Sequence, residues 1–489
     1  MKPSNLLFIF SDEHNKKVTG CYGDDVVQTP HLDRLAARGT RFTQAYTNCP
    51  ICVPARASLA TGRHVHQHRC WDNAIAYQGV QPSWGHRLMA QGHDVVSIGK
   101  LHYSGHDPLR NGFTEEIQPL HIVDGLGDLL GLIRQEMPLP VRKGAAMLGP
   151  EAGPGESDYV RYDRAVRDAA VQWLRRRAGD AGGKPWVLYV GFVAPHFPLI
   201  VPQEFFDLYP EQRMAMPKQY AHDERPTHHP FIQQLRGAQI YDQGFTGQAM
   251  VRRALSAYYG LVSFLDDNIG QILAALEASG LAGSTRIVYG SDHGDNLGAR
   301  GLWGKSTMYE ESAGIPLIVA GDGVARGAQC DAPVSLVDMF PTIVQCVGGT
   351  LDAQDRDLPG ASLWDIAAGR AAPRTVLSEY HAAGSSTGAF MIRHGKYKYI
   401  YYVGMPPMLY DLENDPEERR DLGGDPACAG ILRECEQALR AVVDPEAANA
   451  LCLRDQARRI EEVGGIEAVK QRGMFRFSPP PGADPVMFK

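Results

Sequence analysis

Residues 5–13, NLLFIFSDE, place a short apolar run directly before two carboxylates. The run at residues 6–10 is too short for a helix and is typical of a buried parallel strand. Two later runs, at residues 186–192 and 286–289, also stop abruptly at polar residues. Helical patterns at residues 30–38, 162–177 and 254–279 lie between the runs. This alternation predicts an α/β fold, with a large, mostly parallel sheet sandwiched by helices.

Chemically active side chains follow each of the three runs. Asp12 and Glu13 end the first run, His196 follows the second, and Asp292 and His293 end the third. In open α/β sheets, ligands bind beyond the carboxyl ends of the strands. We therefore expect these side chains to gather at one edge of the sheet, where carboxylates and imidazoles together would bind a divalent cation.

The sequence changes in character near residue 373. Residues 388–402, GAFMIRHGKYKYIYY, have a central His-Gly turn flanked by β-forming residues, which predicts an antiparallel hairpin. Helical sequence follows from about residue 427 to 471. We therefore divide the chain into a catalytic α/β domain at residues 1–372 and a smaller C-terminal subdomain at residues 373–489. The subdomain should contain an antiparallel sheet, helix and an extended tail.

Composition excludes several classes of protein. The 489 residues are 44% hydrophobic and carry a net charge of -7, which fits an ordinary soluble globular protein and argues against a nucleic-acid partner. The first apolar run is too short to span a membrane and lacks the features of a signal peptide. We therefore expect a cytoplasmic protein without a membrane partner. Nine scattered cysteines do not form a disulfide framework.

Residues 48–63, NCPICVPARASLATGR, combine a cysteine with the start of a predicted helix. Pro54 suits the first helical turn, and Gly62 provides a left-handed stop. Cys52 would then lie at a helix N-terminus, where free N–H groups favour an anion. Arg56 adds a planar cation one turn later. The stretch predicts an anion-binding loop that contains a cysteine.

Further cationic and imidazole side chains occur in short motifs. Lys100 and His102, in SIGKLHYSG, would lie on one side of an extended segment. His196 lies between two prolines in APHFP, and Lys305 follows in GLWGKSTMYEE. Together these side chains would supply cations for an oxyanion and proton carriers for a leaving group.

Two competing interpretations are less well supported. His64, His66 and His68 could project three imidazoles from one side of a strand, but no thiolate or carboxylate lies at zinc spacing, so we interpret them as structural. Cys52 could act as a simple thiolate nucleophile. Thiolate phosphatases, however, carry an arginine six positions after the cysteine, where this chain has Ser58, and they need no metal carboxylates.

The motif Cys52-Val53-Pro54-Ala55-Arg56, with Ser58 and Thr61-Gly62-Arg63, resembles the signature of the type I sulfatases of the alkaline phosphatase superfamily. The Asp292-His293 pair is similar to that of the choline-sulfatase and phosphonate monoester hydrolase branch. The resemblance implies an alkaline phosphatase-like fold. It covers residues 5–422 in blocks, namely TPHLDRLAARGTRFTQAY, GKLH, APHFP, SDHGDNLG, GLWGKSTMYEES and LYDLENDPEERRDL.

The resemblance also implies a chemistry for Cys52. In this family a formylglycine-generating enzyme oxidises the motif cysteine to formylglycine, whose hydrate carries two hydroxyls on one carbon. One hydroxyl attacks sulfur, and the second then loses its proton so that sulfate is expelled and the aldehyde returns. One divalent cation, Ca²⁺ or Mn²⁺, assists. The implied metal ligands are Asp12, Glu13, Cys52, Asp292 and His293.

The remaining implied roles concern the substrate. Arg56 would hold the nucleophile and the metal site in place. Lys100 and Lys305 would bind sulfate oxygens. His102 would act as the base for collapse of the intermediate. His196 would bind substrate and protonate the leaving oxygen, and the Asn73 amide would bind the transferred group.

Three functions are compatible with this pattern. The first is hydrolysis of a small-molecule sulfate ester, the second is hydrolysis of phosphonate monoesters or phosphodiesters on the same scaffold, and the third is non-catalytic anion binding. The alcohol pocket should come from residues 105–159, residues 197–206 and the tail at residues 474–489. Some relatives lay such a tail across a neighbouring subunit, so we expect a homodimer or homotetramer with this tail on a partner chain.

Overall fold

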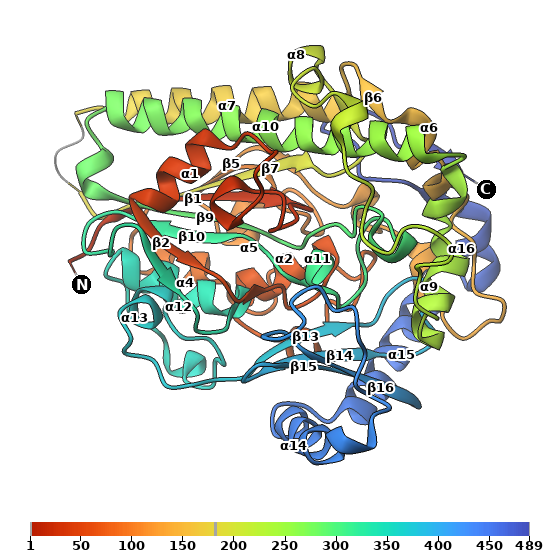
Figure 1. The fold of residues 1–489 in the computed structure, drawn as a ribbon. Coiled ribbons are helices and arrows are strands. Elements are labelled where there is room, and N and C mark those ends of the chain that lie inside the picture. Colours follow the sequence, from red (N-terminus) through yellow and green to blue (C-terminus); the bar gives the residue numbers. More distant parts are fainter. Residues whose placement is uncertain (1, 180–182, 489) are drawn as a thin grey trace.

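Eight strands form the central sheet of the computed structural model, which describes residues 2–179 and 183–488 (Figure 1). The strand order is β11-β2-β10-β9-β1-β7-β4-β5, and β10 runs antiparallel to both neighbours while the other pairs are parallel. The predicted α/β fold with a mostly parallel sheet is confirmed. The strands are β1 (Asn5–Asp12), β2 (Gly39–Phe42), β4 (Val95–Lys100), β5 (Glu115–Leu120), β7 (Val187–Pro195), β9 (Thr285–Ser291), β10 (Leu317–Ala320) and β11 (Ala328–Cys330).

The first strand shows why its sequence is an unbroken apolar run. Leu7 and Ile9 point into one hydrophobic core, whereas Leu6, Phe8 and Phe10 point into the core on the opposite face. Successive side chains of a strand alternate between faces, so a strand buried on both sides must be apolar throughout. The three predicted runs form the adjacent strands β9, β1 and β7 at the centre of the sheet.

Helices cover both faces of the sheet (Figure 1). One face carries α1 (Pro30–Ala37), α7 (Asp158–Arg176) and α10 (Gln248–Ala278). Each of these helices includes residues of a predicted helical pattern. Helix α7 begins four residues before the predicted start at residue 162, because the Ser157 hydroxyl caps it by accepting a hydrogen bond from Val160 N. The other face carries α2 (Cys52–Thr61), α4 (Trp84–Ala90), α12 (Met339–Cys346) and α13 (Leu363–Ala367).

A second sheet follows in the last quarter of the chain. It is antiparallel, with the order β13 (Val376–Tyr380), β14 (Ala389–His394), β15 (Tyr397–Tyr402) and β16 (Met405–Asp411). The predicted hairpin is β14–β15, and Gly395, at φ 55°, begins its turn. Helices α14 (Ala429–Arg440), α15 (Pro445–Glu462) and α16 (Ile466–Arg472) complete this part.

Side chains of the small sheet share a hydrophobic cluster with the chain that leads into α2. Tyr380 and Met391 from the sheet join Cys49 and Ile51 in this cluster. The small sheet therefore supports the segment that ends at Cys52. The remaining elements are short: α3 (Val65–His68), α5 (Pro108–Asn111), α6 (Leu148–Glu151), α8 (Gln203–Phe206), α9 (Pro230–Gln239), α11 (Glu310–Ala313), β3 (Ala45–Tyr46), β6 (Gly153–Pro154), β8 (Ile200–Val201), β12 (Val334–Ser335), β17 (Met474–Phe475) and β18 (Met487–Phe488).

One alternative that we set aside, a strand with three imidazoles on one side, does not form, and one local expectation, the extended segment at His102, is wrong. Residues 65–68 form the short helix α3 rather than a strand, and their imidazoles have separate partners: His66 Nδ1 lies 2.8 Å from Glu379 Oε1, and His68 Nε2 lies 2.9 Å from Ser58 Oγ. His102 lies outside an extended segment, because β4 ends at Lys100 and His102 adopts φ 59°. Its N–H donates to Leu120 O, a contact that turns the chain out of the strand.

All nine cysteines are free thiols. Within residues 2–179 and 183–488, no helix has both the length and the apolar character needed to cross a membrane.

Candidate active site

The carboxyl ends of the central strands converge on the N-terminus of α2. Asp12 is the last residue of β1, Lys100 ends β4, and Asp292 follows β9. Cys52 is the first residue of α2, directly after the N-cap residue Ile51. The left-handed C-cap at Gly62, with φ 66°, ends this helix as predicted.

Four side chains form a compact group of potential metal ligands. Asp12, Cys52, Asp292 and His293 each offer one ligand atom, and these atoms lie within 4.8 Å of one another. Cys52 Sγ is 3.2 Å from His293 Nε2 and 3.5 Å from Asp12 Oδ1. His293 Nδ1 lies 3.1 Å from Gly294 O, so Nδ1 carries the proton and the Nε2 lone pair faces the group. Predicted metal ligands from three separate segments of the chain therefore lie close together.

The Arg56 guanidinium holds the two carboxylates of this group in place through hydrogen bonds. Its Nε donates to Asp292 Oδ2 at 2.9 Å, and Nη2 donates to Asp12 Oδ2 at 3.0 Å. Its Nη1 donates to Lys100 O and to Tyr189 OH. The Arg56 side chain is 2% exposed and both carboxylates are 0% exposed, so this is a fully buried ion-pair network. Arg56 fixes one oxygen of each carboxylate and leaves Asp12 Oδ1 toward Cys52.

Two lysines and an imidazole contact the carboxylates of Asp12 and Glu13. Lys305 Nζ is 3.3 Å from Cys52 Sγ and 2.9 Å from Glu13 Oε2, and Lys100 Nζ is 2.7 Å from Asp12 Oδ2. Glu13 Oε2 also lies 3.4 Å from His196 Nε2. Glu13 therefore contacts Lys305 and His196 and lies outside the four-ligand group, and its role as a metal ligand stays a prediction.

Burial sets the protonation of the groups around Cys52. Burial, reinforced by Asp12, raises the pKa of the Cys52 thiol to about 12. Burial and Asp12 likewise raise the pKa of Asp292 to about 7. An unmodified Cys52 is thus a protonated thiol at neutral pH, which disfavours simple thiolate catalysis.

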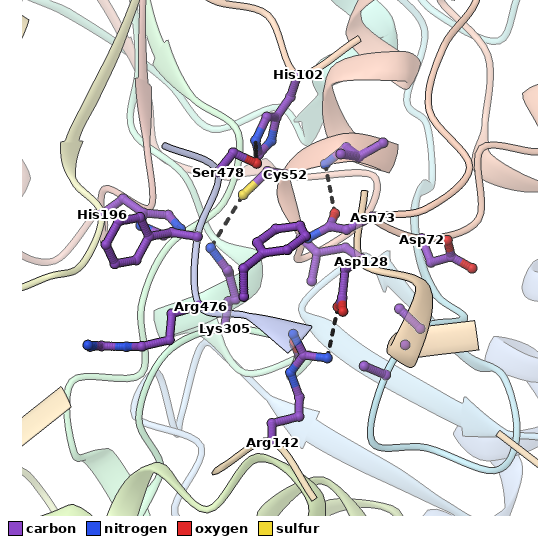
Figure 2. A pocket seen from close by; sticks show the side chains of 18 of the residues that line it. Cys52, Asp72, Asn73, His102, Asp128, Arg142, His196, Lys305, Arg476 and Ser478 are labelled. Carbon is purple, nitrogen blue, oxygen red and sulfur yellow. Dashed lines mark hydrogen bonds and ion pairs between the residues drawn. The ribbon is translucent and has the colours of Figure 1, made fainter. Parts of the chain in front are cut away.

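Cys52 lines a cavity of about 80 Å³ (Figure 2). Every residue to which the sequence assigned sulfate binding or proton transfer lines it: Asn73, Lys100, His102, His196 and Lys305. Asn73 Oδ1 accepts a hydrogen bond from Val53 N at 3.2 Å, which places the amide at the N-terminus of α2. The structure thus brings the predicted substrate-binding residues together around Cys52.

Comparison with known proteins places this geometry in a family. The family described as Sulfatase matches residues 4–349. A choline-sulfatase from Rhizobium meliloti (strain 1021) is 33% identical over 472 residues, which cover 93% of this chain and 90% of that protein. The chain belongs to the sulfatase family. It is a sulfuric ester hydrolase.

Another relative and a second family description match the chain, and a solved structure shares its fold. Arylsulfatase K from Danio rerio is 28% identical over 466 residues, and this match covers 90% of this chain and 84% of that protein. The C-terminal region of N-sulphoglucosamine sulphohydrolase matches residues 298–444. The phosphonate monoester hydrolase SpPMH from Silicibacter pomeroyi shares the fold, with a TM-score of 0.73, 24% identity and coverage of 90% of this chain and 95% of that chain.

The cavity also contains residues that no motif indicated. Asp128 and Arg142, from the segment at residues 105–159, form an ion pair of 2.8 Å (Figure 2). Asp72 and Tyr159 also line the cavity. The Gly- and Pro-rich composition of this segment indicated an insertion over the site, but no periodicity marked the individual side chains. Only the folded structure identifies them.

The tail of this sulfatase reaches its own cavity. Residues 475–478 line the cavity, and Ser478 Oγ lies 3.0 Å from His102 Nε2. Tyr159 OH donates to Ser478 O at 2.6 Å, and the Phe477 ring packs against the Tyr159 ring. The tail therefore contributes to the pocket as expected, but on the same chain rather than on a partner. The homo-oligomer stays a prediction.

Deleting residues 474–489 should raise KM by about tenfold, because it removes the Ser478–His102 hydrogen bond and an aromatic wall of the cavity. Steady-state kinetics with an aryl sulfate measures this change. Ser478→Ala, which removes one hydroxyl, should give a smaller increase. Because the tail lies on its own chain, light scattering should show no change in mass. An unchanged KM after the deletion would exclude the tail from the substrate site.

Proposed function

We propose that this sulfatase hydrolyses the sulfate ester of a small alcohol or phenol, using formylglycine at position 52 and one divalent cation. The observation that carries the proposal is the position of Cys52, whose Sγ lies within 3.5 Å of Asp12, His293 and Lys305. A nucleophile formed there would contact both the metal ligands and a sulfate-binding lysine. The 80 Å³ cavity supports a small alcohol group.

The four-ligand group suits a divalent cation. Two carboxylates and a neutral imidazole provide oxygen and nitrogen donors, and one oxygen of each carboxylate is already held by Arg56. Asp12, Asp292, His293 and residue 52 would hold the ion. A cation there would favour the deprotonated form of a nearby hydroxyl. Oxygen donors suit Ca²⁺ and the imidazole suits Mn²⁺, and both ions are candidates.

The two lysines provide the positive charge for the sulfate group. Lys100 and Lys305 are both buried, and their ammonium groups lie next to Asp12 and Cys52 respectively. In a site screened from water, such charges stabilise the oxygens of a tetrahedral anion far more than they would in solution. Asn73 would add an amide N–H from the side of α2.

The two histidines are suited to opposite proton transfers. His196 Nδ1 lies 2.6 Å from Phe197 O and donates to it, so Nε2 is the nitrogen that faces Glu13 Oε2, at 3.4 Å, and the cavity. His196 would act as an acid only after Nε2 takes up a second proton, which the Glu13 carboxylate would stabilise and which Nε2 would then pass to the leaving oxygen. His102 contacts Ser478 through Nε2, while its buried Nδ1 has no hydrogen-bond partner in the described part of the chain. Burial and Lys100 lower the pKa of His102, which keeps it neutral and able to accept a proton.

Mass spectrometry of the peptide that contains Cys52 tests the proposal most directly. The peptide from protein produced with a formylglycine-generating enzyme, the proposed partner, should carry formylglycine. The peptide that contains Cys452, a buried thiol on α15, is the internal control and should be unmodified. Full activity with an unmodified Cys52 would overturn the proposal. The ratio of kcat/KM for an aryl sulfate to that for a phenyl phosphonate then tests the alternative substrate class.

Removal of the cation should abolish most activity. Chelation should inactivate the enzyme, and Mn²⁺ or Ca²⁺ should restore it. Asp292→Asn should weaken metal affinity by about 100-fold or more, because it removes a charge from the ligand group. Asp266→Asn is the matched control: Asp266 is also buried with a pKa of about 7, but it caps α1 and should not affect metal affinity. Full activity in metal-free protein, checked by elemental analysis, would refute the metal assignment.

His196→Ala should affect poor leaving groups most. A phenol with a high pKa needs a proton as its bond to sulfur breaks, so its sulfate ester should lose about 100-fold or more in kcat/KM. A nitrophenol leaves as its anion and should lose far less. The slope of log kcat/KM against leaving-group pKa measures the effect. A parallel line for wild type and variant would remove His196 from the acid role.

A further inference from the structure

A second group of metal-ligating side chains lies outside the active site, next to the edge strand β5. His106, Glu116 and His121 each offer one ligand atom, and these atoms lie within 4.8 Å of one another. Glu116 is the second residue of β5, His121 follows the strand directly, and His106 lies in the loop before α5. The proposed catalytic mechanism uses none of the three.

The centre of this group is a buried carboxylate. The Glu116 side chain is 0% exposed, and its Oε2 lies 2.7 Å from His106 Nδ1 and 3.4 Å from His121 Nε2. In the described part of the chain these two imidazoles are its ion-pair partners. Burying a carboxylate such as Glu116 is costly in a low-dielectric interior unless a cation balances its charge. A bound cation would balance it.

Neighbouring groups hold the three side chains in place. Asn111 Nδ2 donates to Glu116 Oε1 at 2.7 Å and to Gly105 O at 2.9 Å. Asn111 therefore orients the carboxylate, directs Oε2 toward both imidazoles and fixes the loop that carries His106. The His121 side chain is 8% exposed, and its Nδ1 has no hydrogen-bond partner in the described part of the chain. The two hydrogen bonds of Asn111 are outer contacts of the kind that support metal ligands.

We infer that His106, Glu116 and His121 form a second metal site, which binds Zn²⁺. Two imidazoles and one carboxylate are a ligand set that zinc prefers, with a fourth position left for water. Zinc ligands at about 2.0–2.1 Å from the ion are about 3.3 Å apart in a tetrahedron. The 3.4 Å between His121 Nε2 and Glu116 Oε2 already meets this spacing. His106 Nδ1 lies closer than this to Glu116 Oε2, at 2.7 Å, but the His106 side chain is 58% exposed and has room to move away from the carboxylate.

The zinc site is connected to the loop that carries His102. Leu101 N and His102 N both donate to Leu120 O, next to His121, and Ile122 N donates to Tyr103 O. Bound zinc would therefore link His106, at one end of this loop, to His121, which directly follows the residue that accepts the hydrogen bonds from the other end. The metal site itself does not depend on the proposed role of His102.

Zinc titration of the full chain tests the inference. Competition with a chromophoric chelator gives the number of bound Zn²⁺ ions and their affinity. Both His106→Ala and His121→Ala should lose one zinc equivalent, and Asn111→Ala should weaken that equivalent by about 10–100-fold. His394→Ala is the matched control, because His394 also lies near a glutamate, Glu434 at 3.2 Å, but without a second imidazole. It should bind as much zinc as the wild type.

The active site is a second source of zinc binding and needs its own variant. Cys52→Ala combined with Asp292→Asn should keep the zinc equivalent that His106→Ala removes. Zinc should also raise the Tm of this double variant, and the added His106→Ala should cancel that rise. Because His106 is exposed, its replacement should not prevent folding. Unchanged zinc stoichiometry and affinity in both His106→Ala and His121→Ala would overturn the inference.

Discussion

Cys52→Ala should lower kcat by about four orders of magnitude or more, as removal of a catalytic nucleophile does in other hydrolases. The fold should stay intact, because alanine is a strong helix former and position 52 is the first residue of α2. Turnover of an aryl sulfate and thermal unfolding measure the two effects. Cys49→Ala is the control: Cys49 is equally buried three residues earlier but does not line the cavity, so kcat should not change.

Cys52→Ser separates the two halves of the reaction. A serine hydroxyl could accept the sulfate group, but it has no second hydroxyl on the same carbon and so no equivalent route to release it. We expect at most one slow turnover, followed by a stable sulfated peptide in the mass spectrum. Several fast turnovers by the alanine or the serine variant would contradict the formylglycine mechanism.

Arg56→Met should reduce the free energy of unfolding by about 3–5 kcal/mol, the usual effect of removing one partner from a buried ion pair. Asp12 and Asp292 would both lose their hydrogen bonds to the guanidinium while staying buried. Urea unfolding measures the loss. Activity should fall as well, because the two carboxylates would repel each other and leave the metal-binding position.

Arg63→Met is the matched control in the same stretch of sequence. Arg63 pairs with Asp357, whose side chain is 69% exposed, so its loss should cost about 1 kcal/mol or less. Arg56→Lys keeps the charge but cannot donate from three nitrogens, and it should recover part of the stability. If Arg56→Met costs no more than Arg63→Met, the guanidinium does not hold the carboxylates together.

The centre of the fold and of the site could be predicted because both depend on local sequence. A run such as residues 6–10 must be a strand buried on both sides, and the residues after such strands must meet at one edge of the sheet. Asp12, Asp292 and His293 were found by this reasoning. Cys52 and Arg56 were found because proline and glycine mark the ends of α2.

The rest of the site depends on contacts between distant parts of the chain. His102 leaves the strand direction because its N–H bonds to Leu120 O, and no local pattern encodes that contact. Residues 64–68 suit a strand by spacing, but Glu379 and Ser58 hold their imidazoles in a helix. Arg142 and Asp128 lie in a segment without periodicity, and the position of Ser478 depends on Tyr159 and His102.

The burial of Cys52 has a consequence for the order of events during synthesis. The residue is 1% exposed at the bottom of a cavity that Phe475 to Ser478 help to close. An oxidising enzyme cannot bind the surrounding stretch once that cavity has formed. The ribosome makes residues 475–478 more than four hundred positions after Cys52. If Cys52 is oxidised as proposed, the oxidation should occur on the growing chain or before folding is complete, and a molecule that folds first should stay inactive.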